Sequence, residues 1–284
     1  MKNLTLYFLA VLIAVISLPI AAKRSVANEG VPKITVHYND SVIELDVEEY
    51  VLRVIACEMG DIEQEETLKS LAVSVRSSAV YITLFGCKHA GFDVCDDRNC
   101  CFPLADLSTI DENDLKRAEN AVDSTRGLAL TVDELPAMAL YCGCASSGSI
   151  DNSEFGYIVG VSENIACETH KTELELEGEV FLELIGSTPD GHYCLVYGEN
   201  NKCDFAVING RVVEGSEFSK LLGLNSTEIV IEEGETVVCR SYGLGHGYGL
   251  SLCGAERMAS VGLGFEKILE FYFPRLLLNK IYGD

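Results

Sequence analysis

A short stretch of the chain concentrates side chains that bind transition metals. One histidine and three cysteines, His89, Cys95, Cys100 and Cys101, fall within thirteen residues. Imidazole nitrogen and thiolate sulfur are the ligands of structural zinc sites, which are closed and tetrahedral. The spacing therefore predicts one structural zinc per chain. Because four protein ligands leave no open position, a catalytic zinc is disfavoured.

Disulfides are the competing interpretation of these cysteines. Cys95 with Cys100 or Cys101 would form a plausible pair, whereas two adjacent cysteines do not readily bond to each other. Cys87 is a spare candidate ligand. The chain has twelve cysteines, and three metal ligands would leave an odd number, so the remaining pairs cannot be assigned.

The elements that position this segment follow from hydrophobic periodicity and turn residues. Apolar alternation around Asn39-Asp40 predicts a β-hairpin. Helical spacing predicts helices and shorter alternating runs predict strands, so that the whole is α+β, with mixed helices and short strands. The expected hairpin, helices and strands span 33–47, 48–58, 64–85, 111–124, 128–132, 137–142, 193–197, 205–208, 229–231, 237–240 and 255–273.

Length and charge narrow the class of protein. We expect one domain over 33–284 of the 284 residues, with an acidic surface excursion at 167–183. The net charge is −23. Nucleic acid is excluded as a partner because phosphate binding needs a basic face. A neutral or weakly charged glycan is a more compatible ligand.

The N-terminus is apolar. Residues 4–22 form a stretch of nineteen residues, close to the roughly 20 that span a bilayer as a helix. We expect residues 1–26 to be an uncleaved transmembrane anchor, with a cleaved signal peptide as the alternative. The rest of the chain then lies on the extracytoplasmic side of the cell membrane.

Three separated segments together resemble one family. Residues 49–59 read EYVLRVIACEM, followed by LKSLAVSVR at 68–76. The second segment has CASSGS at 144–149 and GYI at 156–158. The third has LGLNST at 222–227 and GLGHGYGLSLCGA at 243–255. These strings resemble EYLxGVVAAEM, ALKAQAVAART, HSTSGG, PYL, LGLRST and GWGHGVGMSQYGA of the SpoIID family, which is related to the LytB amidase enhancers. Clostridial members also look similar in the metal segment, with a histidine at the position of Cys100.

Several polar positions of the family pattern are replaced here. Leu71 and Leu252 stand where the family pattern has glutamine, and Cys144 stands where it has histidine. These changes affect expected glycan contacts more than the expected fold.

The resemblance implies that Glu58 is the catalytic acid of a lytic transglycosylase. The sequence is compatible with that role, because Glu58 follows the apolar run 54–57 and an apolar setting raises a carboxyl pKa. A general acid must hold its proton near neutral pH. The alternative is an exposed glutamate at a helix end.

Further candidates for substrate binding come from the same segments. Ser147 and Tyr157 match polar residues of the family pattern and are expected to hydrogen-bond the sugar, or else to be ordinary loop residues. His246 lies among glycines that allow close approach, and is either a ligand contact or a structural residue. Lys69 and Arg76 lie seven apart on one helix face. For Arg76, a buried carboxylate is the more favoured partner than the substrate.

The resemblance implies cleavage of the MurNAc–GlcNAc β-1,4 bond in peptide-stripped peptidoglycan strands, with 1,6-anhydro-MurNAc ends, during engulfment in sporulation. It also implies partner engulfment proteins, namely an amidase and a membrane scaffold. The competing hypothesis is a catalytically weakened protein that binds glycan or stimulates an amidase, as LytB-like relatives do. A plain exported metal-binding domain would leave the glycine-histidine segment unexplained.

Overall fold

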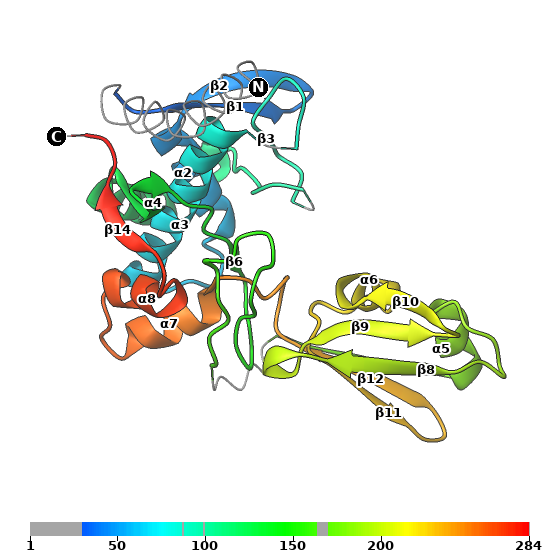
Figure 1. Ribbon diagram of the computed structural model, residues 1–284. Coiled ribbons are helices and arrows are strands. Elements are labelled where there is room, and N and C mark those ends of the chain that lie inside the picture. The colour runs from blue at the N-terminus through cyan, green and yellow to red at the C-terminus, as the bar shows by residue number, and fades with distance from the viewer. Residues whose placement is uncertain (1–29, 87, 99, 164–169, 284) are drawn as a thin grey trace, which may run out of the picture. The chain divides into compact units, whose positions relative to one another are not determined.

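The computed structural model describes residues 30–86, 88–98, 100–163 and 170–283 (Figure 1). The contacts within the chain divide it into two compact units, Met1–Ala139 with Arg275–Asp284, and Leu140–Pro274. The expected anchor, residues 1–26, lies outside the described residues. Within the described ranges, every helix is too short or too polar to cross a bilayer.

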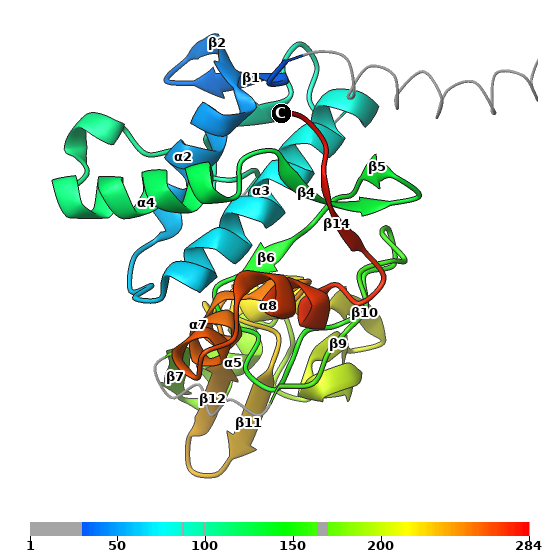
Figure 2. The ribbon, with the colours of Figure 1, turned by 90° about the vertical axis from the view of Figure 1, so that its left-hand side faces the viewer.

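Three helices form the centre of the first unit. They are α2 (Val47–Glu58), α3 (Glu65–Phe85) and α4 (Glu112–Ser124), close to the predicted bounds. Figure 2 shows α3 with α2 and α4 on one side and a strand, β4, on the other. The first turns of α2 and α3 each carry two glutamates, which the helix dipole favours. Gly86, with φ +84°, ends α3 in a conformation suited to glycine.

A three-stranded sheet lies beside these helices. The predicted hairpin is confirmed as β1 (Lys33–Tyr38) and β2 (Ser41–Asp46). Its two-residue turn has positive φ at Asn39 and Asp40, as a tight hairpin requires. The short strand β3 (Val94–Cys95) pairs in parallel with β1. The hairpin therefore anchors the loop after α3, which we call the metal segment because it carries the four predicted ligands between residues 89 and 101.

A second small sheet completes the unit. Its central strand β4 (Leu128–Val132) pairs with β5 (Leu135–Pro136) and with the C-terminal strand β14 (Leu277–Lys280). The 3₁₀ helix η1 (Leu107–Thr109) precedes α4. The bounds of β4 are those predicted, whereas β14 was not predicted.

In the second unit, two segments that are far apart in the sequence pair with each other. Strand β6 (Tyr141–Cys142) is parallel to β13 (Leu250–Ser251), and the helices α7 (Leu252–Ser260) and α8 (Phe265–Tyr272) follow. The helix predicted over 255–273 is thus two helices, separated by residues 261–264. Of the strand predicted over 137–142, only the last two residues form one.

The remainder of the second unit is rich in strands. Strand β12 lies between β11 and β7, and β9 lies between β10 and β8. The helices are α5, α6 and the 3₁₀ turn η3. The bounds are β7 (Lys171–Leu176), α5 (Gly178–Leu184), β8 (Tyr193–Tyr197), η3 (Glu199–Asn201), β9 (Cys203–Ile208), β10 (Arg211–Glu214), α6 (Gly215–Leu221), β11 (Ile229–Glu233) and β12 (Val237–Tyr242).

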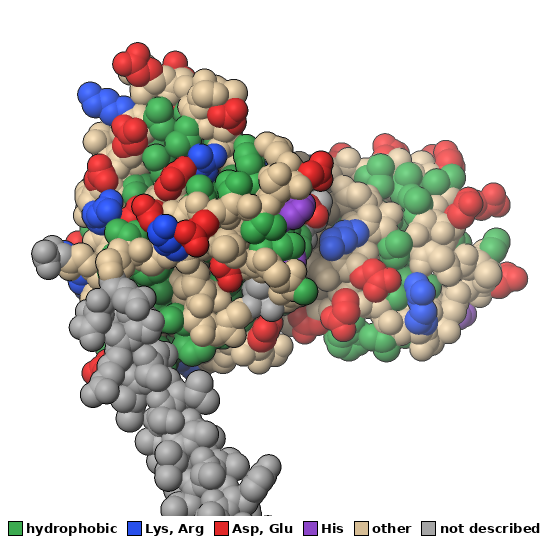
Figure 3. Space-filling view, turned by 90° about the horizontal axis from the view of Figure 1, so that it is seen from above, with side chains coloured by type: hydrophobic (Ala, Val, Ile, Leu, Met, Phe, Trp, Pro, Cys, Tyr) green, Lys and Arg blue, Asp and Glu red, His purple; other side chains and the backbone are tan. Residues whose placement is uncertain are grey.

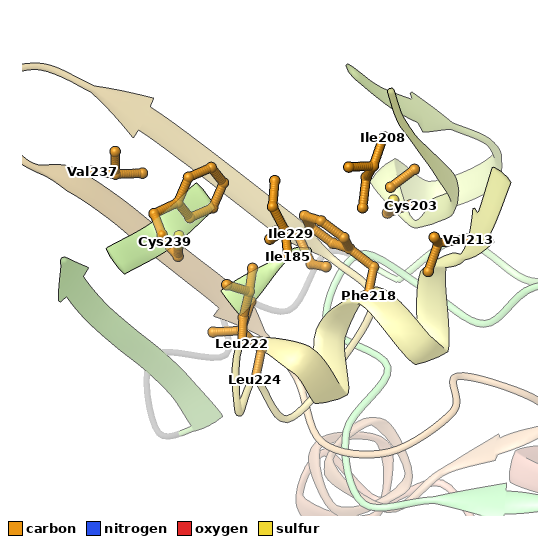
Figure 4. Packing of buried hydrophobic residues seen from close by; sticks show 12 residues of the cluster. Ile185, Cys203, Ile208, Val213, Phe218, Leu222, Leu224, Ile229, Val237 and Cys239 are labelled. Carbon is orange, nitrogen blue, oxygen red and sulfur yellow. The ribbon is translucent and has the colours of Figure 1, made fainter. Parts of the chain in front are cut away.

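This part has its own hydrophobic core. Figure 4 shows Phe218 of α6 among buried side chains that include Ile229 of β11 and Ile185, the residue that follows α5. Phe181 of α5 is also buried in it, and β7 pairs along its whole length with β12. The segment from residue 171 to 183 therefore belongs to a sheet and a core, and differs from the surface excursion expected from its acidity.

Candidate active site and metal centre

The four predicted metal ligands lie together in the first unit. One ligand atom from each of His89, Cys95, Cys100 and Cys101 lies within 4.8 Å of all the others. The His89 Nε2 atom is 3.2 Å from the Cys101 Sγ and 3.6 Å from the Cys100 Sγ. All three cysteines are free thiols in the structure, so the alternative of a disulfide among them is not what forms. Cys87 lies outside the described residues.

The geometry fits a small tetrahedral ion. With Zn–S bonds of about 2.3 Å and a Zn–N bond of about 2.0 Å, the ligand atoms of a tetrahedral zinc with one nitrogen and three sulfurs lie roughly 3.5–3.8 Å apart. The 4.0 Å between the Cys100 and Cys101 sulfurs is close to this. The donor set of one imidazole and three thiols therefore suits zinc, and it leaves no ligand position for a substrate.

Local hydrogen bonds shape the metal segment. Strand β3 carries Cys95 opposite His37 of β1. The backbone N–H groups of Cys100 and Cys101 both donate to the carbonyl of Asp97, at 2.9 and 2.8 Å. These two bonds hold the backbone of the adjacent cysteines, whose sulfurs both belong to the cluster.

Glu58 is the last residue of α2, and its side chain is 17% exposed. Burial raises the pKa of its carboxyl, and the nearby Arg98 guanidinium opposes that rise. The Arg98 Nη2 atom lies 3.5 Å from the Glu58 Oε1. The carboxyl is thus half-buried and yet reachable, as a general acid must be.

Arg76 and Lys69 have protein partners. Arg76 is fully buried and donates to both carboxylate oxygens of Glu48, the shortest bond being 2.7 Å. Glu48 also accepts from the Tyr282 hydroxyl at 3.0 Å. Arg76 was expected to pair either with a buried carboxylate or with the substrate. In the structure it pairs with a buried carboxylate. The half-buried Lys69 ammonium lies 2.6 Å from Glu66.

Ser147, in the second unit, belongs to a hydrogen-bonded network. Its hydroxyl donates to the Glu228 carboxylate at 2.6 Å, and its backbone N–H donates to the same carboxylate at 3.2 Å. The buried Lys202 ammonium lies 2.9 Å from Glu228 and donates to the carbonyl of Ala145. Ser146, the residue before Ser147, has φ +56°. The network therefore fixes the loop that carries Ser147.

Tyr157 and His246 are also in the second unit. The half-buried Tyr157 ring lies 5.9 Å from that of Phe155. The exposed His246 ring stacks 5.2 Å from Tyr248, and its Nδ1 accepts the Tyr248 backbone N–H. In the neutral ring the proton is therefore on Nε2, which is the atom that can donate.

The glycines around His246 serve backbone packing. A Cβ at Gly249 would lie 2.1 Å from the Leu140 carbonyl oxygen, and one at Gly243 would lie 2.6 Å from the Cys144 carbonyl oxygen. Both have positive φ. Small residues at these positions thus let the loop pair with residues 140–144.

The sequence analysis missed four residues that act on these side chains. Arg98 faces Glu58, Glu48 neutralises Arg76, and Lys202 with Glu228 holds the loop of Ser147. Each partner is 26 to 81 residues away in the chain. The position of Glu48 on the buried face of α2 was a usable signal, because a buried glutamate requires a partner.

Comparison with known proteins shows which family this chain resembles. The family described as SpoIID, stage II sporulation protein, matches residues 37–132, a range that includes Glu58 and the four candidate metal ligands. Over 260 residues the chain is 29% identical to stage II sporulation protein D of Bacillus subtilis (strain 168), covering 83% of this chain and 75% of that protein. The resemblance to the SpoIID family is confirmed.

Two further relatives cover a similar share of the chain. Stage II sporulation protein D of Bacillus amyloliquefaciens is 26% identical, covering 83% of this chain and 74% of that protein. An uncharacterized protein of Brachyspira hyodysenteriae (strain ATCC 49526 / WA1) is 27% identical, covering 83% of this chain and 68% of that protein. SpoIID relatives over most of the chain support a sporulation-related role.

The departures from the SpoIID pattern can now be placed. Leu71 and Leu252 are buried, where a leucine is more favourable than an unpaired glutamine. Cys144 is buried and disulfide-bonded. The side chains at the three replaced positions are therefore all buried.

Proposed function

We propose that this protein is a peptidoglycan lytic transglycosylase. It cleaves the β-1,4 bond between MurNAc and GlcNAc in peptide-stripped glycan strands, and Glu58 is its acid and base. The observation that carries the proposal is the half-buried Glu58 carboxyl at the end of α2, whose pKa is raised by burial, within the segment that matches the SpoIID family.

A single carboxyl can perform both proton transfers. Protonated Glu58 donates its proton to the glycosidic oxygen as the bond from C1 of MurNAc to that oxygen breaks. The 6-hydroxyl of the same MurNAc attacks C1, and the Glu58 carboxylate accepts the hydroxyl proton. The products are a 1,6-anhydro-MurNAc end and a free 4-hydroxyl on GlcNAc, with Glu58 protonated again.

This chemistry needs no second carboxylate. Ordinary glycoside hydrolases use one carboxyl as acid and another as nucleophile or as the base for water. Here the nucleophile belongs to the substrate. In agreement with this, the charged partner of Glu58 is a cation, Arg98.

The metal contributes structure. His89, Cys95, Cys100 and Cys101 would hold a zinc ion, which supplies a cross-link for the loop after α3 when bound. The protons in the reaction are moved by Glu58.

The second unit supplies candidates for glycan contacts. The Ser147 hydroxyl oxygen has a lone pair left after donating to Glu228. The exposed His246 ring has Nε2 as a donor, and Tyr157 offers a ring on which a sugar can stack. We assign these three residues to binding of the sugar hydroxyls and the acetamido group, together with Lys69.

The remaining parts of the proposal concern the cell. The protein acts in engulfment during sporulation, with its described residues on the extracytoplasmic side and residues 1–26 as a single-pass anchor in the cell membrane. A partner amidase supplies glycan stripped of stem peptides, and a membrane scaffold places both enzymes.

Product analysis tests the activity. Peptide-free glycan is incubated with the protein, and anhydromuramyl ends are measured by mass spectrometry. We expect product from the wild type and none from Glu58→Gln, which keeps the size of the side chain. The matched control is Glu63→Gln, an acidic residue just beyond α2, which should retain activity.

The competing function is glycan binding or amidase stimulation without cleavage. It is favoured by the three replaced polar positions, Leu71, Cys144 and Leu252. Under that function the wild type would yield no anhydromuramyl ends at saturating glycan binding, and it would accelerate an amidase equally with Glu58→Gln. That pair of results would refute the transglycosylase proposal.

A further inference from the structure

The metal segment places a positive charge beside Glu58. Arg98 lies between the ligands Cys95 and Cys100 in the sequence. Its Nη2 atom is 3.5 Å from the Glu58 Oε1 and 3.7 Å from the Cys57 Sγ. The same short loop therefore carries three metal ligands and the cationic partner of Glu58.

The Arg98 side chain is 66% exposed. The backbone is held by hydrogen bonds on both sides of this residue. Before it, the N–H of Asp96 donates to the carbonyl of His37 at 3.2 Å, which ties the chain to β1. After it, the N–H groups of Cys100 and Cys101 close a turn on the Asp97 carbonyl.

The second restraint involves Cys100 and Cys101, which are two of the four candidate metal ligands. With both thiolates bound to one ion, Cys100 and Cys101 are held in place, and so are the hydrogen bonds from their N–H groups to the Asp97 carbonyl. Without an ion, the adjacent thiols have no attraction for His89 or for each other beyond weak hydrogen bonds. The ion thus determines how narrowly the Arg98 backbone is restrained.

We propose that Arg98 is a positioning residue that couples the metal site to Glu58. Metal bound at His89, Cys95, Cys100 and Cys101 holds the Arg98 guanidinium against the Glu58 carboxyl, and loss of the metal releases it. The inference rests on the proposed function for the role of Glu58, but its physical content, a metal-dependent ion pair, can be measured without any reaction.

The ion pair has a defined effect on the proton of Glu58. Among the described residues, Arg98 is the charged group that acts on this carboxyl, and α3 and α4 place no charged side chain within ion-pair distance of it. A nearby cation favours the carboxylate. Removing Arg98 therefore moves the pKa of Glu58 further upward, because burial then acts unopposed.

The direction matters for the proposed reaction. Glu58 must give up its proton and then, as the carboxylate, take one from the sugar hydroxyl. A cation at 3.5 Å from Oε1 stabilises the carboxylate between these steps. Its loss should lower the maximal rate and shift the alkaline limb of the pH profile to higher pH.

The test uses the full chain in detergent, loaded with Zn²⁺ and labelled with glutamate carrying ¹³C at the carboxyl. The Glu58 resonance is assigned by its absence in Glu58→Gln, and its pKa is measured by titration. In Arg98→Ala the pKa should rise, and in Arg98→Lys it should lie between that value and the wild type. The matched control is Arg53→Ala, which removes an arginine of α2 paired with Glu49 and should leave the titration unchanged.

Chelation of the metal provides the second arm. In the wild type, removal of Zn²⁺ should raise the pKa of Glu58 as Arg98→Ala does, and in Arg98→Ala it should cause no further rise. Because the guanidinium is exposed, 1 M salt should also bring the wild type toward the variant.

Two results would overturn the inference. One is an Arg98→Ala titration of Glu58 that superimposes on the wild type. The other is an equal effect of chelation in the wild type and in Arg98→Ala. Both are independent of product formation, so failure of the transglycosylase assay alone would refute the proposed function and leave this coupling standing.

Discussion

The buried ion pair between Arg76 and Glu48 allows a quantitative prediction about the first unit. Glu48→Gln keeps the size of the side chain and removes its charge. Arg76 is 0% exposed, so its charge would remain buried without a counter-ion. Breaking a buried pair by removing one partner costs about 3–5 kcal/mol. We expect the free energy of unfolding to fall by that amount.

The structure explains why the cost should not be lower. Three bonds join the Arg76 guanidinium to the Glu48 carboxylate. The carboxylate also accepts the backbone N–H of Gly127 at 3.1 Å and the Tyr282 hydroxyl. A glutamine can accept these bonds at one oxygen only, and its amide N–H groups face the donors of Arg76.

Urea unfolding followed by far-UV circular dichroism measures this loss. With a slope of about 2 kcal/mol per molar urea, the midpoint should fall by about 2 M. The matched control is Glu65→Gln, which breaks the exposed pair with Arg117. That variant should lose less than about 1 kcal/mol, because surface ion pairs contribute little.

A double variant separates charge from packing. The double variant Glu48→Leu with Arg76→Met removes both charges. It should cost less stability than the sum of the two single changes, because each single change leaves one buried charge unpaired and the double variant leaves none. A loss below about 1 kcal/mol for Glu48→Gln, or simple additivity in the double variant, would refute the role assigned to Arg76.

Three further predictions concern the second unit and the metal. Burial raises the pKa of Glu163 to about 7, above the ordinary 4.5. Its contribution to stability is therefore complete below about pH 4.5 and is lost as the pH rises through 7, by up to about 3 kcal/mol; Glu163→Gln should lack this part of the pH dependence in thermal unfolding, and an unchanged profile would contradict the assignment. Gly249→Ala should cost at least about 2 kcal/mol, because it adds a clash with the Leu140 carbonyl to the strain of φ +68°. Gly262→Ala, at φ +94° with open space around it, should cost about 1 kcal/mol, and equal losses would show that the close approach is unimportant. Cys101→Ser should lower the zinc content measured by elemental analysis, whereas Cys194→Ser, at an exposed free thiol, should leave it at one per chain.

Local patterns in the sequence were sufficient for the helices and the hairpin of the first unit. The apolar spacing in α2 and α3 and the glycine after α3 act within a few residues, so they can be interpreted without the fold. The same holds for the Asn39-Asp40 turn, whose positive φ angles depend only on neighbouring atoms.

The surface excursion predicted over 167–183 shows, in its described part from residue 170 on, where local patterns mislead. In β7 the side chains of Thr172, Leu174 and Leu176 are half-buried, and the residues between them are exposed. This alternation is present in the sequence, but the acidic residues obscured it. Only pairing with β12, more than sixty residues later in the chain, makes the segment a strand.

The sequence by itself indicated the candidate metal ligands and the candidate acid. The four candidate ligands fall within one loop, so their spacing alone brings them close, and Glu58 lies in a segment that matches the SpoIID family. The tertiary structure decided which charge each of the other groups meets. Arg76 meets Glu48 of another helix, and Arg98 meets Glu58 across forty residues. Electrostatic partners depend on distance in space, which only the folded chain defines.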